Sequence, residues 1–292
     1  MHDLRSRCIV DFVPEMRRIH RAALDSTMTI GAWRTEARQK AKSVVGKTRD
    51  LSVLHSLAWA GFLSTGQIER LHFPSRRTVQ RRLRALLDHG LVRACLQGTS
   101  LHLQNVYALT PKGAAHLDAQ GISDAKPRRV VRAQKLEHAL AVRDLFVAFF
   151  VADQSNTIQL EDFRFEDDLA KEPIFQSVGI IPDGLAIVRR GEVRLTVGCE
   201  VDLGSETGRM LKAKCALWAE LLRPKPFGPM ELLFVVSGNG RSNTIERLMT
   251  EVECPGLTVL RSSVIKQPLQ VIDGLFVRTI RALRIGVSKT HE

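Results

Sequence analysis

Three carboxylates in the second half of the chain have types and spacing that suit metal-assisted phosphate chemistry. Asp183 follows Pro182 directly before a strand-like apolar run, and Glu200 and Asp202 stand at the end of the next such run. Carboxylates at the ends of adjacent strands can hold Mg²⁺ through oxygen ligands. A bound Mg²⁺ lowers the pKa of a coordinated water and stabilises charge on a phosphate in transfer.

Lys214, on the predicted helix that follows, completes a candidate catalytic set of Asp183, Glu200 and Lys214. The candidate metal ligands are Asp183, Glu200 and Asp202, with Mg²⁺ as the cofactor. Each residue also has a structural interpretation. Asp183 can be a turn residue, Lys214 can be an ordinary solvated lysine, and the cation between Glu200 and Asp202 can be an Arg or Lys side chain instead of a metal.

A second group of candidate residues is basic and lies on a predicted helix over 76–89 and on the hairpin after it. The apolar residues Val79, Leu83, Leu86 and Leu87 recur at helical spacing and predict the core face of this helix, which leaves its arginines on another face. The planar guanidinium of Arg matches guanine O6 and N7 as well as phosphate, and Gln pairs with adenine. The candidate DNA-binding residues are Arg76, Arg77, Gln80, Arg81, Arg84, Arg93 and His102.

Capping signals define the elements around this helix. Ser64 and Gln67 have capping-box spacing, and Pro74 ends the short helix that they begin. The predicted elements are helices over 51–61, 65–73 and 76–89, two strands within 91–110, and a helix that opens at Pro111. This order is that of a winged helix-turn-helix, in which the second helix of the motif enters the major groove.

From residue 136 the pattern changes to that of an α/β domain. The segment 136–152 is too apolar for a lone surface helix and is expected to pack against a sheet. Predicted strands over 157–165, 183–190, 192–203, 230–238 and 257–263 alternate with predicted helices over 205–222, 241–252 and 273–286. This order predicts a mixed sheet covered by helices.

The charge is divided unevenly along the chain. The formal net charge is +12, but residues 1–136 hold 24 Lys and Arg against 10 Asp and Glu, whereas residues 137–292 hold 19 against 21. A basic half predicts a polyanionic partner. The order of the predicted elements gives the fold class, which is α+β and α/β. The predicted domains are a basic arm (1–49), a winged helix (50–120), a basic linker (121–135) and an α/β domain (136–292).

Several classes of protein are disfavoured by composition. The N-terminus has no apolar signal core, and no apolar run is long enough to cross a bilayer, so we expect a cytoplasmic protein without membrane association. The five cysteines are unclustered, which is typical of reduced thiols without zinc. The single tyrosine, Tyr107, leaves no aromatic platform for RNA and lies in the predicted hairpin, where core packing explains it.

The segment from Ile180 to Lys214 resembles the PD-(D/E)XK nuclease superfamily, whose αβββαβ core matches the elements predicted over 136–237. Pro182-Asp183 and Glu200 fit the motif, but Asp202 stands where its lysine belongs. Some members of the superfamily carry that lysine on the following helix, where Lys214 or Lys212 stands. Other members keep the fold without activity.

The combination of both halves resembles the replication-relaxation family over about residues 50–237. The residues that carry this resemblance are the YALTPKG exit of the hairpin, the HALAVRDLFV helix, IPDG and CEVDLGSET. The resemblance implies a factor for plasmid or mobile-element DNA processing that binds double-stranded DNA. Its C-terminal domain would recruit a relaxase, replication or transposition protein, and a homodimer is one arrangement that this allows. The alternatives are a Mg²⁺-dependent nuclease or nickase, and a transcriptional regulator.

Overall fold

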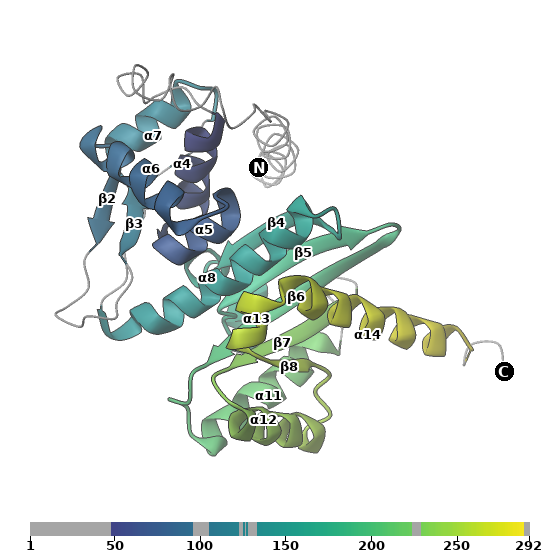
Figure 1. The fold of residues 1–292 in the computed structure, drawn as a ribbon. Helices are drawn as coiled ribbons and strands as arrows, with labels where there is room; N and C mark the ends of the chain where they lie inside the picture. The colour runs from purple at the N-terminus through teal and green to yellow at the C-terminus, as the bar shows by residue number, and fades with distance from the viewer. Residues whose placement is uncertain are drawn as a thin grey trace. The chain divides into compact units, whose positions relative to one another are not determined.

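The computed structural model describes residues 48–95, 105–122, 125, 127, 133–223 and 229–288. Residues 1–47 of the predicted arm, most of the predicted linker and the candidate residue His102 lie outside the described residues. The chain divides into two compact units, residues 1–140 and 141–292, and each is described by itself (Figure 1). The domain boundaries given above stay predictions.

The first unit contains the expected series of helices followed by an antiparallel hairpin. Its elements are α4 (Thr48–Ala60), β1 (Phe62–Ser64), α5 (Thr65–His72), α6 (Arg76–Asp88), β2 (Val92–Cys95), β3 (Val106–Leu109) and α7 (Pro111–Asp118). The capping box of Ser64 and Gln67 is present at the start of α5. Gly90 follows α6 with a positive φ of 67°, a conformation that glycine adopts without steric cost.

A three-stranded antiparallel sheet of order β1-β3-β2 supports these helices. The sequence did not predict β1, because its three residues lie between two helices and are too few to show alternation. Its Phe62 packs with Val106 and Ala108 of β3 and with Leu136 and Ala139 of the next helix, α8 (Ala133–Gln154). The start of α8 therefore contributes to the core of the first unit.

The second unit is a five-stranded sheet of order β4-β5-β6-β7-β8 with helices on both faces. After α8 come β4 (Gln159–Phe165), α9 (Glu166–Leu169), α10 (Pro173–Val178), β5 (Gly184–Arg190), β6 (Val193–Asp202), α11 (Gly208–Leu222), β7 (Met230–Val236), α12 (Asn239–Glu251), β8 (Leu257–Leu260), α13 (Arg261–Lys266) and α14 (Pro268–Ser288). Strands β4, β5 and β6 pair antiparallel, whereas β6, β7 and β8 pair parallel.

Alternation along the strands divides the core between the two faces of this sheet. On one face, Leu232 and Phe234 of β7 join the buried cluster that contains Trp218 of α11 and Ile245 of α12. On the other face, the ring centroids of Phe146 in α8 and Phe163 in β4 lie 5.5 Å apart. Glu231 of β7 lies on this face too and accepts a hydrogen bond from the hydroxyl of Thr279 in α14. Figure 1 shows α11 and α12 on the opposite side of the sheet from α8 and α14.

The prediction of a mixed α/β chain is confirmed, with one small antiparallel sheet and one five-stranded mixed sheet. The strand predicted over 257–263 was wrong in its last three residues, because β8 ends at Leu260 and α13 begins at Arg261. The short helices α9 and α10 were not predicted, since segments of four and six residues show no helical period. No helix among the described residues combines the length and apolar character needed to cross a membrane.

Candidate functional site

Helix α6 turns an arginine-rich face to solvent. Val79, Leu83 and Leu86 are buried, and this apolar stripe fixes the rotation of the helix about its own axis. The opposite face is exposed and consists of Arg77, Gln80, Arg81 and Arg84. All four are candidate DNA-binding residues, and they lie together on one surface of the first unit.

Acidic neighbours neutralise this face only in part. Arg76 pairs with Glu69 of α5 at 3.3 Å, and Arg84 pairs with Asp88 one turn later at 3.0 Å. Both pairs are open to solvent, where ion pairs of this kind contribute little and are readily exchanged. Arg77 forms no ion pair with any residue that the structure describes. The face therefore keeps donors available for a polyanion.

Arg82 differs from the other arginines of α6 because it points into the first unit. Its guanidinium donates through Nε and Nη2 to the two carboxylate oxygens of Asp50, which is buried in the first turn of α4. The partners are 32 positions apart in the sequence and leave no spacing signal, so the pair was not predicted. Asp50 lies inside α4, in the first turn of the helix.

Of the two hairpin candidates, only Arg93 falls within the described residues. It stands exposed on β2, and its Nη1 lies 3.3 Å from the sulfur of Cys95 on the same face of the strand. The sequence-predicted role of Arg93 and His102 in DNA binding stays a prediction.

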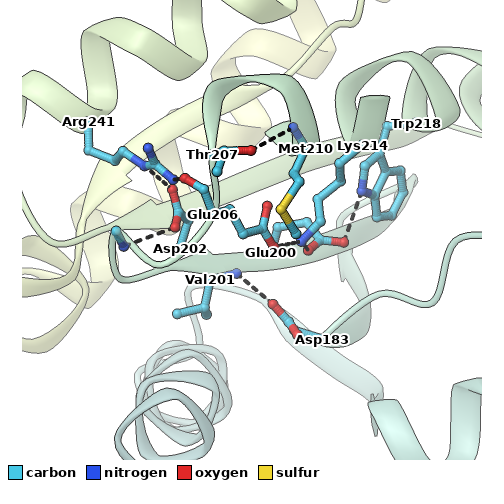
Figure 2. A network of polar contacts seen from close by, with 11 residues as sticks. Asp183, Glu200, Val201, Asp202, Glu206, Thr207, Met210, Lys214, Trp218 and Arg241 are labelled. Carbon is cyan, nitrogen blue, oxygen red and sulfur yellow. Dashed lines mark hydrogen bonds and ion pairs between the residues drawn. The ribbon is translucent and has the colours of Figure 1, made fainter. Parts of the chain in front are cut away.

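In the second unit the sheet brings the predicted carboxylates to one end. Gly184 of β5 stands opposite Cys199 of β6, so the preceding Asp183 comes level with the following Glu200. Asp183 Oδ2 accepts a hydrogen bond of 2.8 Å from the backbone N–H of Val201 (Figure 2). The register of β5 and β6 therefore brings Asp183 and Glu200 to neighbouring positions, as the sequence predicted.

Glu200 is almost fully buried, and both of its carboxylate oxygens accept hydrogen bonds. Lys214 Nζ lies 3.0 Å from Oε2, and the indole N–H of Trp218 lies 2.9 Å from Oε1. Burial, with the negative charge of Asp183, raises the pKa of Glu200, and the ion pair with Lys214 and the hydrogen bond from Trp218 oppose this rise. The negative charges of Glu200 and Glu206 in turn raise the pKa of the Lys214 ammonium, which burial alone would lower.

Asp202 is also buried and has a cation of its own. It pairs with Arg241 of α12, and its other oxygen accepts a hydrogen bond of 2.9 Å from the N–H of Gly204. Arg241 reaches this position because β6 and β7 are parallel, so their carboxyl ends share an edge where the chain turns into α12. The sequence did not predict Arg241, which stands 39 residues from its partner.

Glu206 joins these two ion pairs into one network. Its Oε1 accepts from Lys214 Nζ at 2.6 Å, and its backbone carbonyl accepts from Arg241 (Figure 2). We call Asp183, Glu200, Asp202 and Glu206 the carboxylate cluster. Lys212, the other candidate lysine, lies outside it and pairs with Glu251 at 2.9 Å on the surface.

In this arrangement the carboxylate cluster does not fit a divalent cation. Both oxygens of Glu200 and both of Asp202 already accept hydrogen bonds from the protein, and two side-chain cations stand where a metal ion would bind. No group of three or more His, Cys, Asp or Glu within the described ranges could hold a metal ion. Mg²⁺ binding and catalysis by Asp183, Glu200 and Lys214 stay predictions.

The sequence matches the Replication-relaxation family over residues 54–236, which is more than half of the chain. The chain belongs to the replication-relaxation family. The match contains the exposed face of α6 and the whole carboxylate cluster with Lys214, whereas Arg241 lies just beyond it. No curated protein matches the sequence.

Among solved structures, this replication-relaxation chain is similar to two structures of the restriction endonuclease FokI, one of them bound to DNA. Each is 15% identical and covers 78% of this chain, with TM-scores of 0.28 for the DNA-bound structure and 0.29 for the other. The matched region covers 45% and 44% of those chains, so it spans less than half of their length. TM-scores of this size do not establish a common fold.

Proposed function

We propose that this member of the replication-relaxation family binds double-stranded DNA through a winged helix-turn-helix formed by α4 to α6 with β2 and β3. Helix α6 is the recognition helix of this motif. The observation that carries the proposal is the exposure of Arg77, Gln80, Arg81 and Arg84 on one face of a helix whose other face is buried. A short helix and a tight turn precede it, as the motif requires.

The chemistry of this face suits a duplex. The first turns of a recognition helix approach the base edges, where the planar guanidinium of Arg77 or Arg81 can donate two hydrogen bonds to guanine. Arginines farther along the helix can contact phosphate and contribute affinity without sequence information. Residues 1–136 carry most of the positive charge, which supports an electrostatic share in binding.

Within this proposal the protein is an accessory factor in plasmid or mobile-element DNA processing. The family name supports a role in replication or relaxation of DNA. The second unit, of restriction-endonuclease-like αβββαβ order, would recruit the relaxase, replication or transposition protein that carries out the chemistry. A transcriptional regulator and a Mg²⁺-dependent nickase are the alternatives.

The test of DNA binding uses the full chain and a short fluorescent duplex of arbitrary sequence at low salt. Replacing Arg77 and Arg81 together with Ala is expected to weaken binding by about 2 kcal/mol or more, because two contacts to DNA are lost. Arg209→Ala, an exposed arginine on α11, is the matched control and leaves the affinity unchanged. Equal losses in both variants would mean that α6 is not the DNA-binding face.

Two further measurements separate the alternatives. Supercoiled plasmid incubated with the protein and Mg²⁺ or Mn²⁺ stays intact if the protein is an accessory factor. Nicking that disappears in Asp183→Ala and Glu200→Ala would instead assign a nickase. Footprinting on plasmid DNA then distinguishes protection of a replication or transfer origin from protection of the protein's own promoter, which would indicate a regulator.

A further inference from the structure

We infer that Lys214 and Arg241, in place of a divalent metal ion, compensate Glu200 and Asp202, the two most deeply buried carboxylates of the cluster, so that the cluster is a metal-free structural network. This inference does not depend on DNA binding by α6, and its test can fail or succeed separately.

The first argument is the occupation of the carboxylate oxygens. The oxygens of Glu200 accept from Lys214 and Trp218, and those of Asp202 accept from Arg241 and Gly204. A magnesium ion needs oxygen ligands in near-octahedral geometry and retains several of its waters. To ligate a metal here, Glu200 and Asp202 would have to share or give up these hydrogen bonds and admit water to a buried position.

The second argument is charge. The side chains of Glu200 and Asp202 are each 1% exposed, and each contacts one cationic side chain. A buried carboxylate is stable only when a cation and hydrogen-bond donors compensate it. A divalent ion bound between them would stand beside an ammonium and a guanidinium, so binding would require Lys214 and Arg241 to move away.

The third argument is the position of Glu206 in the connection from β6 to α11. Lys214 of α11 holds its carboxylate, and Arg241 of α12 holds its backbone carbonyl. Thr207 follows directly and caps α11 by accepting from the N–H of Met210 at 3.3 Å. The two cations therefore fasten this connection to both helices, which gives them a structural role that a metal would disrupt.

The decisive experiment measures thermal unfolding of the full chain in EDTA and in millimolar Mg²⁺ or Mn²⁺. The inference predicts that the transition of the second unit has the same midpoint in all three conditions. A midpoint that rises with Mg²⁺ or Mn²⁺, with the rise lost in Glu200→Gln and kept in Glu220→Gln, would overturn it. Glu220 is the matched control because it is an exposed glutamate on the same helix as Lys214.

A second measurement tests the role of the lysine. Lys214→Met is expected to lower the unfolding midpoint by several degrees, because it leaves the buried charge of Glu200 uncompensated. Adding Glu200→Gln should recover part of this loss, since both charges are then absent. If the double variant is no more stable than Lys214→Met, the two residues are not the compensating pair that we infer. If Lys214→Met does not fold, Lys214→Arg replaces it as the test: it keeps the positive charge, so its unfolding midpoint should stay close to that of the wild type.

Trp218 supplies a spectroscopic readout that a general loss of stability would not change. Its indole donates to Glu200, and it is the single tryptophan in residues 141–292. In Trp59→Phe and Trp33→Phe background, Mg²⁺ or Mn²⁺ is expected to leave the emission of the folded wild-type site unchanged. A saturable shift in that emission would show an ion entering the carboxylate cluster and would contradict the inference.

Discussion

Arg82, in the middle of α6, is bound through two guanidinium nitrogens to both carboxylate oxygens of Asp50 at the start of α4. Asp50 is buried, so this pair holds Arg82 to the interior of the unit. The pair adds a directional bond to the apolar stripe of α6. It therefore fixes which face of the helix carries Arg77 and Arg81 outward.

Breaking this pair should destabilise the first unit. Arg82→Ala leaves the carboxylate of Asp50 buried without its cation, and we expect a loss of about 3 kcal/mol in the free energy of unfolding. Urea denaturation followed by circular dichroism measures this loss. Arg84→Ala removes an exposed pair on the same helix and should cost about 0.5 kcal/mol or less. Similar losses in the two variants would refute a special role for Arg82.

Asp88 should oppose DNA binding, because it places a negative charge on the exposed face of α6 and pairs with Arg84. We expect Asp88→Asn to tighten binding to duplex DNA several-fold and to steepen its dependence on salt, since Arg84 becomes available to phosphate. Fluorescence anisotropy at several salt concentrations measures both effects. Asp118→Asn, an exposed aspartate at the end of α7, is the control. If this control tightens binding by the same factor, the effect comes from the change in net charge and not from the position of Asp88 on α6.

The stability of the first unit should fall in mild acid because of His55. Burial lowers the pKa of His55 from 6.5 to about 3, so the folded chain stays neutral at this residue where the unfolded chain takes up a proton. Stability from this residue is complete above the unfolded pKa and is lost as the pH falls from 6.5 toward 3. Near pH 5 the loss is about 2 kcal/mol.

His55→Leu tests this dependence on pH. Urea denaturation at neutral pH and near pH 5 measures how much the free energy of unfolding falls in acid. This fall should be about 2 kcal/mol smaller in the variant than in the wild type. Ser52→Ala, a neighbouring buried position of α4 without a titrating group, should behave as the wild type does. If the free energy of unfolding of His55→Leu falls as much between the two pH values as that of the wild type, other groups cause the acid sensitivity.

Gly198 of β6 should tolerate no side chain. A Cβ atom placed there would lie 2.3 Å from Cη2 of Trp218, whose indole also binds Glu200. Gly198→Ala is therefore expected to destabilise the second unit by about 1–3 kcal/mol, measured by urea denaturation. Gly208→Ala, at the start of α11 with open space around it, should be neutral or slightly stabilising. A neutral Gly198→Ala would show that Trp218 can shift without cost.

The sequence predicted the parts of this fold that depend on local patterns. The apolar stripe Val79, Leu83 and Leu86 gave the buried face of α6, and the spacing of Ser64 and Gln67 gave the start of α5. Adjacent strands also brought Asp183 and Glu200 together, because a hairpin keeps near neighbours in register. These predictions required only periodicity and the geometry of one turn.

The partners of the charged residues could not be predicted in the same way. Asp50 and Arg82 meet only when α4 and α6 have been assembled into the first unit, and Asp202 meets Arg241 only after β7 has paired with β6. The sequence left open whether a metal or a basic side chain stands between Glu200 and Asp202, and no local pattern distinguishes these cases. Long-range pairing decides the chemistry of both sites, while short-range patterns decide the elements that carry them.

The cysteines of the two units should differ in their reactivity toward alkylating reagents. Cys199, Cys215 and Cys254 are buried in the second unit, and burial raises the pKa of Cys215 to about 11 and that of Cys254 to about 12. Since a thiol reacts with alkylating reagents as the thiolate, these three are protected while the unit is closed. Cys95 in the first unit is half-buried. The rate at which the three protected thiols become alkylated therefore reports how often the second unit opens in the native protein.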